Sequence, residues 1–381
     1  MKWEKKKVMD VCELSYGKSL AAPVRIPGEY PVYGSAGEVG THINYLVEGP
    51  GIVIGRKGSV GTVYFEKRNF YPIDTSYYVV PKAENDLRFL YYKFQTLGLE
   101  KLNSDAAVPG LNRNVAYEQS SIYPPLPTQR KIASILSAYD DLIENNLKRI
   151  KLLEEKAQLH YKIEFGEYQF GDKEPQNLPK GWTIKSIGDI YGKLESGSRP
   201  KGGIDKELKE GIASVGAENV IGLGKYNYQS EKLITEAFFE NMNRGKIENK
   251  DILIYKDGAY IGKTTLFQDD FPHEKCCVNE HVFLLRSKDD LYQNYLFFTL
   301  YQKLYFDKMQ QLNANAAQPG INQKSLKSLR ILWPSENVIE EFNEKVESLM
   351  KLIFVVAKQN TKLREARDIL LPKLMNGQIE L

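Results

Sequence analysis

One short pattern occurs twice in the chain and decides its fold. "GIVIGRKGSVGTVYF" (residues 51–65) and "DILIYKDGAYIGKTTLF" (residues 251–267) each hold three apolar residues, three others, a glycine, a spacer and a second glycine. Gly58 and Gly258 are 200 residues apart, and the second copy has one extra residue before Gly262. Apolar runs punctuated by glycines are typical of short strands and tight turns. The pattern therefore predicts one structural unit at two places.

The second copy also resembles a phosphate-binding loop, because Gly262 is followed by Lys263 and a threonine. That motif needs four residues between its glycines, so that backbone N–H groups can surround a phosphate. Only three residues separate Gly258 from Gly262, and Asp257 occupies the position of the first glycine, where a carboxylate would repel the ligand. The first copy has no lysine after Gly61. We therefore do not expect nucleotide binding here.

Further matching blocks lie on both sides of this pattern, always in the same order. The distance between matching blocks grows along the chain from 179 to 210 residues, so we infer a tandem duplication with insertions in the second copy, mostly between Gly211 and Lys250. The blocks are "VMDV" (8–11) and "IGDI" (187–190), each after a tryptophan, "DTSYYVVPK" (74–82) and "NEHVFLLRS" (279–287), "AAVPGLNR" (106–113) and "AAQPGINQ" (316–323), and "IYPP" (122–125) and "LWPS" (332–335).

A long charged segment with apolar residues at heptad spacing follows each copy, beginning near Pro127 and Pro334. Asn146 interrupts the first apolar stripe, and Asn360 and Arg367 interrupt the second. Such stripes predict two helices that bury them on each other. The apolar positions are Ile132, Leu136, Tyr139, Ile143, Ile150, Leu153 and Ala157 in the first segment, and Phe342, Val346, Leu349, Ile353, Val356, Leu363, Leu370 and Leu374 in the second.

The two asparagines allow a sharper prediction. If a pseudo-two-fold axis relates the copies and crosses the helix pair, the helices run antiparallel, and Asn146 and Asn360 fall in the same core layer. An unpaired buried amide would cost ~1–3 kcal/mol, whereas a matched pair satisfies itself and penalises slipped registers. The alternative is that one or both asparagines face water.

The layout predicts the α/β (α+β) class, with two mixed α/β domains separated by a long two-helix antiparallel coiled coil. We expect a first domain at residues 1–127, a central spacer helix at 128–165, a linker at 166–180, a second domain at 181–334 and a C-terminal spacer helix at 335–381.

Composition limits the possible functions. The formal net charge is only +3, so binding to a polyanion has to use local patches. The three cysteines and four histidines form no metal-ligand or redox motif, and we expect buried or half-buried thiols in a reducing compartment. No apolar run is long enough to cross a bilayer and no signal peptide is evident, so we expect a cytoplasmic protein without a membrane segment.

The order and duplication of these blocks resemble the specificity subunits of type I restriction-modification systems. "GRKGSVGTVYF" with "AAVPGLN", and "YKDGAYIGK" with "AAQPGIN", are similar to that family's two target recognition domains. "LPTQRKIASILSAYDDLIE" (126–144) and "LREARDILLPKLMNGQIEL" (363–381) are similar to its helical spacers.

The resemblance implies a non-catalytic protein that binds double-stranded DNA at a bipartite site, one part for each domain. It implies two modification (methyltransferase) subunits that use S-adenosylmethionine, and restriction subunits that use ATP and Mg²⁺, with no cofactor in this chain. Because the second domain carries the insertion, the two domains are expected to read different sequences, which makes the site asymmetric.

Two other classes of function remain open. A self-contained DNA methyltransferase would need an [N/D]-P-P-[Y/F] motif. In "YPPL" (123–126), Tyr123 lacks the required acceptor and Leu126 cannot stack, so the prolines fit a strand-to-helix stop better. A coiled-coil adaptor without a DNA role is the other alternative.

Base reading needs paired donors or acceptors, and phosphate contacts need cations or backbone N–H groups. The glycine-flanked loops offer both, although Gly58, Gly61, Gly258 and Gly262 themselves are expected only to form turns, and Asn112 and Asn322 have helix capping as an alternative role. The candidate DNA-binding residues are Arg56, Lys57, Ser59, Asn112 and Arg113 in the first domain, and Lys256, Asp257, Tyr260, Lys263, Asn322 and Gln323 in the second.

Overall fold

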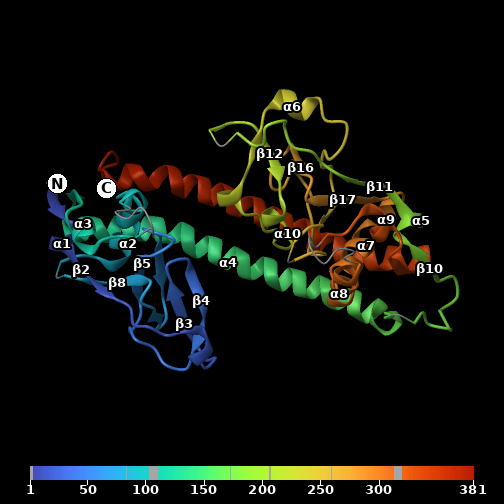
Figure 1. Ribbon diagram of the computed structural model, residues 1–381, viewed down its shortest axis with the longest axis horizontal. Coiled ribbons are helices and arrows are strands. Elements are labelled where there is room, and N and C mark those ends of the chain that lie inside the picture. Colours follow the sequence, from blue (N-terminus) through green and yellow to red (C-terminus); the bar gives the residue numbers. More distant parts are fainter. Residues whose placement is uncertain are drawn as a thin grey trace. The chain divides into compact units, whose positions relative to one another are not determined.

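The computed structural model describes residues 3–82, 84–102, 110–171, 173–205, 207–258, 260–312 and 320–381. The chain forms two compact units, one of residues 1–142 with 363–381 and the other of residues 143–362. Each unit contains one mixed α/β part, which we call the first head (residues 3–123) and the second head (residues 183–333), together with segments of two long helices (Figure 1).

The first head is built on a four-stranded antiparallel sheet in the order β2-β8-β5-β6. All five residues of β5, "GIVIG", are buried, as expected for a strand covered on both faces. A smaller sheet has the order β4-β3-β7, and helix α2 packs beside β5 and β6. The bounds are β2 Cys12–Tyr16, β3 Tyr30–Gly34, β4 Gly37–His42, β5 Gly51–Gly55, β6 Val63–Glu66, β7 Tyr71–Pro72, β8 Ser76–Pro81 and α2 Leu87–Gln95.

The second head repeats this topology. Its antiparallel sheet has the order β11-β17-β14-β15, its smaller sheet has the order β13-β12-β16, and α7 follows β17 as α2 follows β8. In both small sheets the central strand pairs antiparallel on one side and parallel on the other. The bounds are β11 Tyr191–Ser196, β12 Ile212–Val215, β13 Leu233–Ile234, β14 Ile252–Tyr255, β15 Thr264–Leu266, β16 Cys276–Val278, β17 Val282–Ser287, α7 Gln293–Leu300 and α8 Lys303–Gln311.

The strand registers correct one detail of the repeat. Tyr77 pairs with Ile54, and Phe283 pairs with Ile254, so Tyr77 and Phe283 are equivalent. Blocks 74–82 and 279–287, taken position by position, are therefore one residue out of register, and a shift of one residue would turn every side chain to the opposite face of the sheet. A loop of different length precedes each strand, and sequence matching alone could not place the shift.

The two heads differ most between the central strand of the small sheet and the next long strand. The first head has only β4 there, whereas the second head has two 3-10 turns, β13 and helix α6 (Glu236–Glu240) between β12 and β14. The extra segment reaches the long helices of its own unit at Gly224. That residue has φ +64°, and an added Cβ would lie 2.8 Å from the Ile353 Cγ2 atom, so only glycine fits without a shift.

Each head is closed by a strand pair that leads into a long helix. β1 pairs with β9 in the first head, and β10 pairs with β18 in the second. Two prolines follow β9, and α4 begins at Leu126 with Pro127 in its first turn, where proline costs no hydrogen bond. The bounds are β1 Glu4–Lys7, α1 Val8–Val11, α3 Arg113–Tyr117, β9 Ser120–Tyr123, α4 Leu126–Phe165, β10 Thr183–Ser186, α5 Ile187–Ile190, α9 Gln323–Lys327, β18 Arg330–Trp333 and α10 Glu336–Met375.

Helices α4 and α10 lie side by side and antiparallel, as predicted (Figure 1). Within the second unit Asn146 meets Asn360 whereas Glu164 meets Lys345, so the two residue numbers run in opposite directions along the pair. The heptad positions are largely buried and join the core of the nearest head. The buried positions are Ile132, Leu136, Ile143, Ile150, Ala157, Phe342, Val346, Leu349, Ile353, Val356 and Leu374.

The asparagine pair is confirmed. Asn146 Nδ2 donates to Asn360 Oδ1 at 2.9 Å, and Asn360 Nδ2 donates to the Ile143 carbonyl at 3.3 Å. Both side chains are buried, so the alternative that one or both asparagines face water is wrong. In the first unit, Arg367 donates to Asp140 Oδ1 at 2.8 Å, and this carboxylate also accepts from Arg88 and Tyr92 of α2.

Each head is anchored to a long helix from equivalent positions of α2 and α7. "FLYYKF" (89–94) matches "YLFFTL" (295–300), so Lys93 of the first head is equivalent to Thr299 of the second head. Lys93 Nζ donates to the Met375 carbonyl near the end of α10 at 2.8 Å, and Thr299 Oγ1 accepts from the Tyr161 hydroxyl of α4 at 2.9 Å. Burial lowers the pKa of Lys93 to about 8.

The three cysteines are free and buried, which confirms their expected state. Among the described residues, no helix is long and apolar enough to span a membrane. No group of three or more His, Cys, Asp or Glu side chains in this part of the chain is placed to hold a metal ion.

Candidate nucleic-acid interface

The candidate loops connect β5 to β6 and β14 to β15, and each is fixed against the segment that leads into α3 or α9. Backbone N–H groups of Leu111 and Ile321 donate to the carbonyls of Arg56 and Lys256 at 2.8 and 2.9 Å. Lys57 and Asp257 form matching isolated bridges with Gly110 and Gly320. The predicted residues on both sides of each contact are therefore brought together. Residues 103–109 and 313–319, which include most of the "AAVPG" and "AAQPG" blocks, lie outside the described residues.

The glycines of these loops form turns, as expected. Gly58 and Gly258 have φ +80° and +91°, a region that L side chains rarely adopt. Strand β15 begins at Thr264, directly after Lys263, where a phosphate-binding loop would open a helix. The resemblance to that motif is therefore coincidental.

In the first head, two guanidinium groups lie against one exposed tyrosine. The Cζ atoms of Arg56 and Arg113 each lie 5.0 Å from the centre of the Tyr16 ring, which is 47% exposed. Arg56 Nη1 also donates to the Asp74 carbonyl at 3.2 Å. Contact with Tyr16 positions both cations before any ligand binds, and the hydrogen bond to Asp74 further restrains Arg56. Lys57 and Ser59 are exposed in the same loop.

The buried Tyr77 contacts this cluster from the protein interior. Its hydroxyl donates to the Leu111 carbonyl at 2.9 Å, and the Arg56 guanidinium lies 5.9 Å from its ring. Burial, aided by a hydrogen bond with Tyr16, raises the pKa of Tyr77 to about 12, although both arginines oppose the shift. The tyrosine is neutral at physiological pH and offers no competing negative charge.

In the second head, the equivalent cation also lies on an aromatic ring, but its neighbours differ. Lys256 Nζ lies 5.1 Å from the centre of the Phe283 ring. Asp257 Oδ2 lies 3.0 Å from His281 Nδ1. His281 Nε2 in turn lies 2.9 Å from Arg199 Nη2 and 3.1 Å from a Glu280 carboxylate oxygen. The loop thus presents a connected network of both charge signs.

This network borders a polar cavity of about 560 Å³ within the second head. Glu218 and Lys232 form an ion pair on its wall at 2.5 Å. Burial opposes ionisation of Glu218, but the hydrogen bond from Lys232 and its positive charge leave the pKa of this carboxyl below its ordinary value. The cavity wall therefore remains charged at neutral pH.

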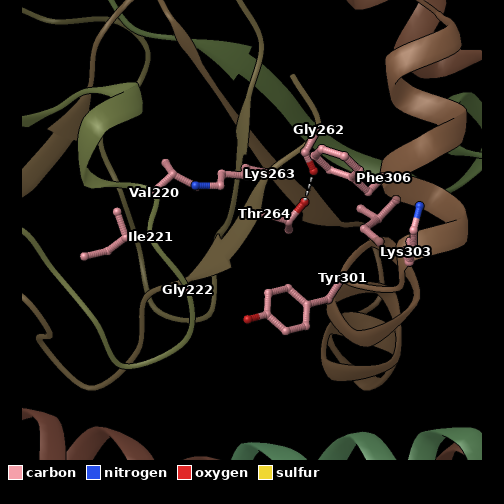
Figure 2. A pocket seen from close by; sticks show the side chains of 10 residues that line it. Val220, Ile221, Gly222, Gly262, Lys263, Thr264, Tyr301, Lys303 and Phe306 are labelled. Carbon is pink, nitrogen blue, oxygen red and sulfur yellow. Dashed lines mark hydrogen bonds between the residues drawn. The ribbon is translucent and has the colours of Figure 1, made fainter. Parts of the chain in front are cut away.

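Tyr260 and Lys263 lie apart from this network. Lys263 Nζ lies 4.8 Å from the centre of the Tyr260 ring, which is 60% exposed. Lys263 lines another pocket of about 410 Å³, together with Ile221, Gly222 and Tyr301 (Figure 2). The candidates of this loop are therefore divided between two surfaces, with Lys256 and Asp257 on one and Tyr260 and Lys263 on the other.

The asparagines before α3 and α9 act as helix caps. Asn112 Oδ1 accepts from the N–H groups of Asn114 and Val115, and Asn322 Oδ1 accepts from the N–H group of Ser325. The capping alternative is thus confirmed, and a base contact by either side chain stays a prediction. Gln323 Nε2 donates to the Leu194 carbonyl, which ties this candidate to its own sheet.

The "YPPL" segment has the structural role expected of a stop. Tyr123 is the last residue of β9 and is buried in the core of the first head. The Pro124 carbonyl accepts from Gln129 Nε2 at 3.0 Å, within the first turns of α4.

Several residues of these sites were not among the sequence candidates, notably Tyr16 and His281, which contact candidate side chains, and Arg199, which contacts His281. Tyr16 is 97 residues from Arg113, and no local sequence pattern predicts that the two side chains stack. His281 belongs to the repeated block "NEHVFLLRS", and its replacement of an uncharged residue in the first copy was a usable signal. Arg199 lies in a segment without a clear counterpart.

Comparison with known proteins agrees with this architecture. The model of the family "Type I restriction modification DNA specificity domain" matches residues 1–155 and 179–358. The chain belongs to this family.

Two similar curated proteins come from Methanocaldococcus jannaschii. The type I restriction enzyme MjaIX specificity subunit is 27% identical over 316 residues, which cover 80% of this chain and 71% of that protein. The MjaVIII specificity subunit is 22% identical over 344 residues, which cover 87% of this chain and 76% of that protein. A crystal structure of the type I restriction-modification S subunit from M. genitalium has the same fold, with a TM-score of 0.60, 18% identity, and coverage of 98% of this chain and 96% of that chain.

Proposed function

We propose that this chain is the DNA-sequence-specificity subunit of a type I restriction-modification complex, and that each head reads one half of a bipartite, asymmetric site in double-stranded DNA. One observation carries the proposal. Both heads hold a cation on an aromatic ring at the same loop position, Arg56 near Tyr77 and Lys256 near Phe283, but surround it with different polar side chains.

This combination fits the two tasks of a sequence reader. Phosphate contacts position a protein on DNA without regard to sequence, and they need a cation. Base contacts discriminate, and they need donors and acceptors that suit one base edge. A cation kept in both heads suits the first task, and neighbours that differ between the heads suit the second.

The chain itself catalyses nothing in this proposal. Two modification subunits bring S-adenosylmethionine and transfer the methyl group, and restriction subunits bring ATP and Mg²⁺. The duplicated architecture supports a pair of modification subunits, because each unit offers a partner the same type of head beside the same type of helix pair.

The test is a domain exchange in the assembled complex. Residues 1–127 are replaced by the corresponding domain of another family member, and the methylated sites are mapped in genomic DNA by sequencing. We expect one half of the recognition site to change while the other half and the spacing stay the same. A change in both halves would refute separate reading by the two heads.

The purified chain without its partners provides the second arm of the test. We expect no methyl transfer from S-adenosylmethionine and no ATP hydrolysis. Robust turnover of either substrate by this chain alone would refute the non-catalytic role.

A further inference from the structure

The duplication allows the two loops to be compared residue by residue. The N–H groups of Arg56 and Lys256 donate to the carbonyls of Thr75 and His281 at 2.9 and 3.1 Å, so these cations are equivalent. The next residues, Lys57 and Asp257, form the same bridge to a glycine of the second segment. Two identical backbone frames thus present side chains of opposite charge.

The loop of the first head offers hydrogen-bond donors. Lys57 is exposed, and Arg56 and Arg113 hold planar guanidinium groups on Tyr16. Lysine and arginine have no acceptor atoms. Among the bases, guanine presents two acceptors, O6 and N7, on its major-groove edge, and bidentate arginine or lysine is its commonest partner.

The loop of the second head offers an acceptor at the same place. The Asp257 side chain is 37% exposed, and its hydrogen bond to His281 fixes its orientation. A carboxylate has two oxygens and about four acceptor positions, so one bond to a histidine leaves capacity for a ligand. Carboxylates accept hydrogen bonds from exocyclic amino groups of bases, typically cytosine N4.

We propose that positions 57 and 257 determine which type of base each head selects: guanine for the first head, and a base with a major-groove amino group for the second. This inference rests on the proposed function and refines it, because it assigns the difference between the half-sites to one backbone position. His281 then acts as a positioning residue, since it orients the Asp257 carboxylate.

The experiment selects DNA from a randomised double-stranded library with the assembled complex of this chain and its modification subunits. The variants are Lys57→Asp, Asp257→Lys and the isosteric Asp257→Asn. The controls, Lys5→Asp and Asp290→Asn, make similar charge changes at exposed positions outside the loops. Domain exchange at residues 1–127 identifies which half-site belongs to the first head.

We expect a guanine in the half-site of the first head, and a loss of roughly 5- to 150-fold in preference for it in Lys57→Asp, since one good base contact is worth ~1–3 kcal/mol. Asp257→Lys should reduce the preference for cytosine or adenine in the other half-site by a similar factor, and Asp257→Asn should favour adenine over cytosine. Each variant should leave the opposite half-site unchanged, and both controls should keep the wild-type consensus.

Two failures are distinguishable. If the wild-type complex enriches no sequence, the proposed function itself is wrong. If the wild type enriches a bipartite site but Lys57→Asp and Asp257→Lys leave every position unchanged, or alter the half-site of the other head, the function stands and this inference is overturned.

Discussion

The two heads have the same arrangement of strands and turns but carry different exposed side chains beside their candidate loops. In the first head, the guanidinium groups of Arg56 and Arg113 both lie against the Tyr16 ring. The strand registers place Ser196 where the first head has Tyr16, and Gln323 follows the capping Asn322 as Arg113 follows Asn112. The shared arrangement depends on backbone pairing, turns and caps, so these exposed positions can change without changing the fold.

The same contrast holds where each head meets the long helices. The first unit relies on charged groups, with Asp140 between Arg88 and Arg367, and Lys93 on a backbone carbonyl. In the second unit the equivalent of Lys93 is the neutral Thr299, whose hydroxyl accepts from Tyr161, and the equivalent of Arg88 is the neutral Asn294, which donates to the Glu347 carboxylate of α10. The two units should therefore respond differently to substitution, salt and pH.

The largest effect is expected in the first unit from Asp140→Ala. This carboxylate accepts from Arg88, Tyr92 and Arg367, and its removal leaves two partly buried cations without it, at a cost of about 3 kcal/mol in the free energy of unfolding. Urea unfolding measures the change. Asp141→Ala is the matched control, because Asp141 is 58% exposed and its ion pair with Lys67 should contribute about 0–1 kcal/mol. Equal costs for the two variants would contradict this account.

The asparagine pair should show a smaller but coupled effect. Asn146→Leu leaves the buried Asn360 amide without its partner, at a cost of ~1–3 kcal/mol. The double variant Asn146→Leu with Asn360→Leu should recover much of that loss, because no polar group is then left unpaired. A double-mutant cycle measures the coupling, and Asn145→Leu, at the exposed neighbouring position, is the control. Additive costs would show that the pair does not act as a unit.

Arg56 and Lys256, the equivalent cations of the two heads, allow a test of whether both heads contact the DNA backbone in the same way. Arg56→Ala and Lys256→Ala should each weaken DNA binding by the assembled complex about equally for all sequences, and each should reduce the slope of log affinity against log salt concentration by about one. Titrations at several salt concentrations measure both quantities. A changed consensus sequence in either variant would instead identify that cation as a base reader.

The smallest effect concerns pH and only the first unit. Because the pKa of Lys93 is lowered to about 8 from 10.5, the folded state loses this proton before the unfolded state does, so stability rises with pH between about 8 and 10.5. From pH 7 to 9 the gain is about 1 kcal/mol, and Lys93→Met should lack it. Urea unfolding at both pH values, with exposed Lys18→Met as the control, measures the difference. An unchanged pH dependence in Lys93→Met would contradict it.

The sequence predicted those parts of the fold that are written in local patterns. The heptad spacing of Ile132 to Ala157 defined a helix, and the duplication added its antiparallel partner. Together these two signals placed Asn146 and Asn360 in one layer, which the hydrogen bond confirms. The turns at Gly58 and Gly258 were predictable for the same reason, since glycine is the residue that a positive φ favours.

The rest depended on contacts between distant segments. The stacking of Arg113 on Tyr16 and the network of Arg199 with His281 join residues that no spacing rule connects. The burial of Lys93 was also hidden, because a lysine in an amphipathic helix is usually solvated. Lys256 and Lys263 flank one hairpin, but the Lys256 side chain lies on Phe283 whereas the Lys263 side chain lines the pocket that contains Tyr301. Their separation therefore depends on contacts outside the hairpin.

The hydrogen bond between Asn146 and Asn360 spans 214 residues of chain, and this distance has a consequence during synthesis. Helix α4 leaves the ribosome long before α10 exists, and at ~5–20 residues per second its apolar stripe waits about 10 to 40 seconds for a partner. The compact unit that contains the first head also includes residues 363–381, so it is completed only after the second head has been translated. Until α10 is made, the nascent chain therefore carries the part of the α4 stripe that the first head does not cover, and chaperones that shield apolar surfaces have their main opportunity in that interval.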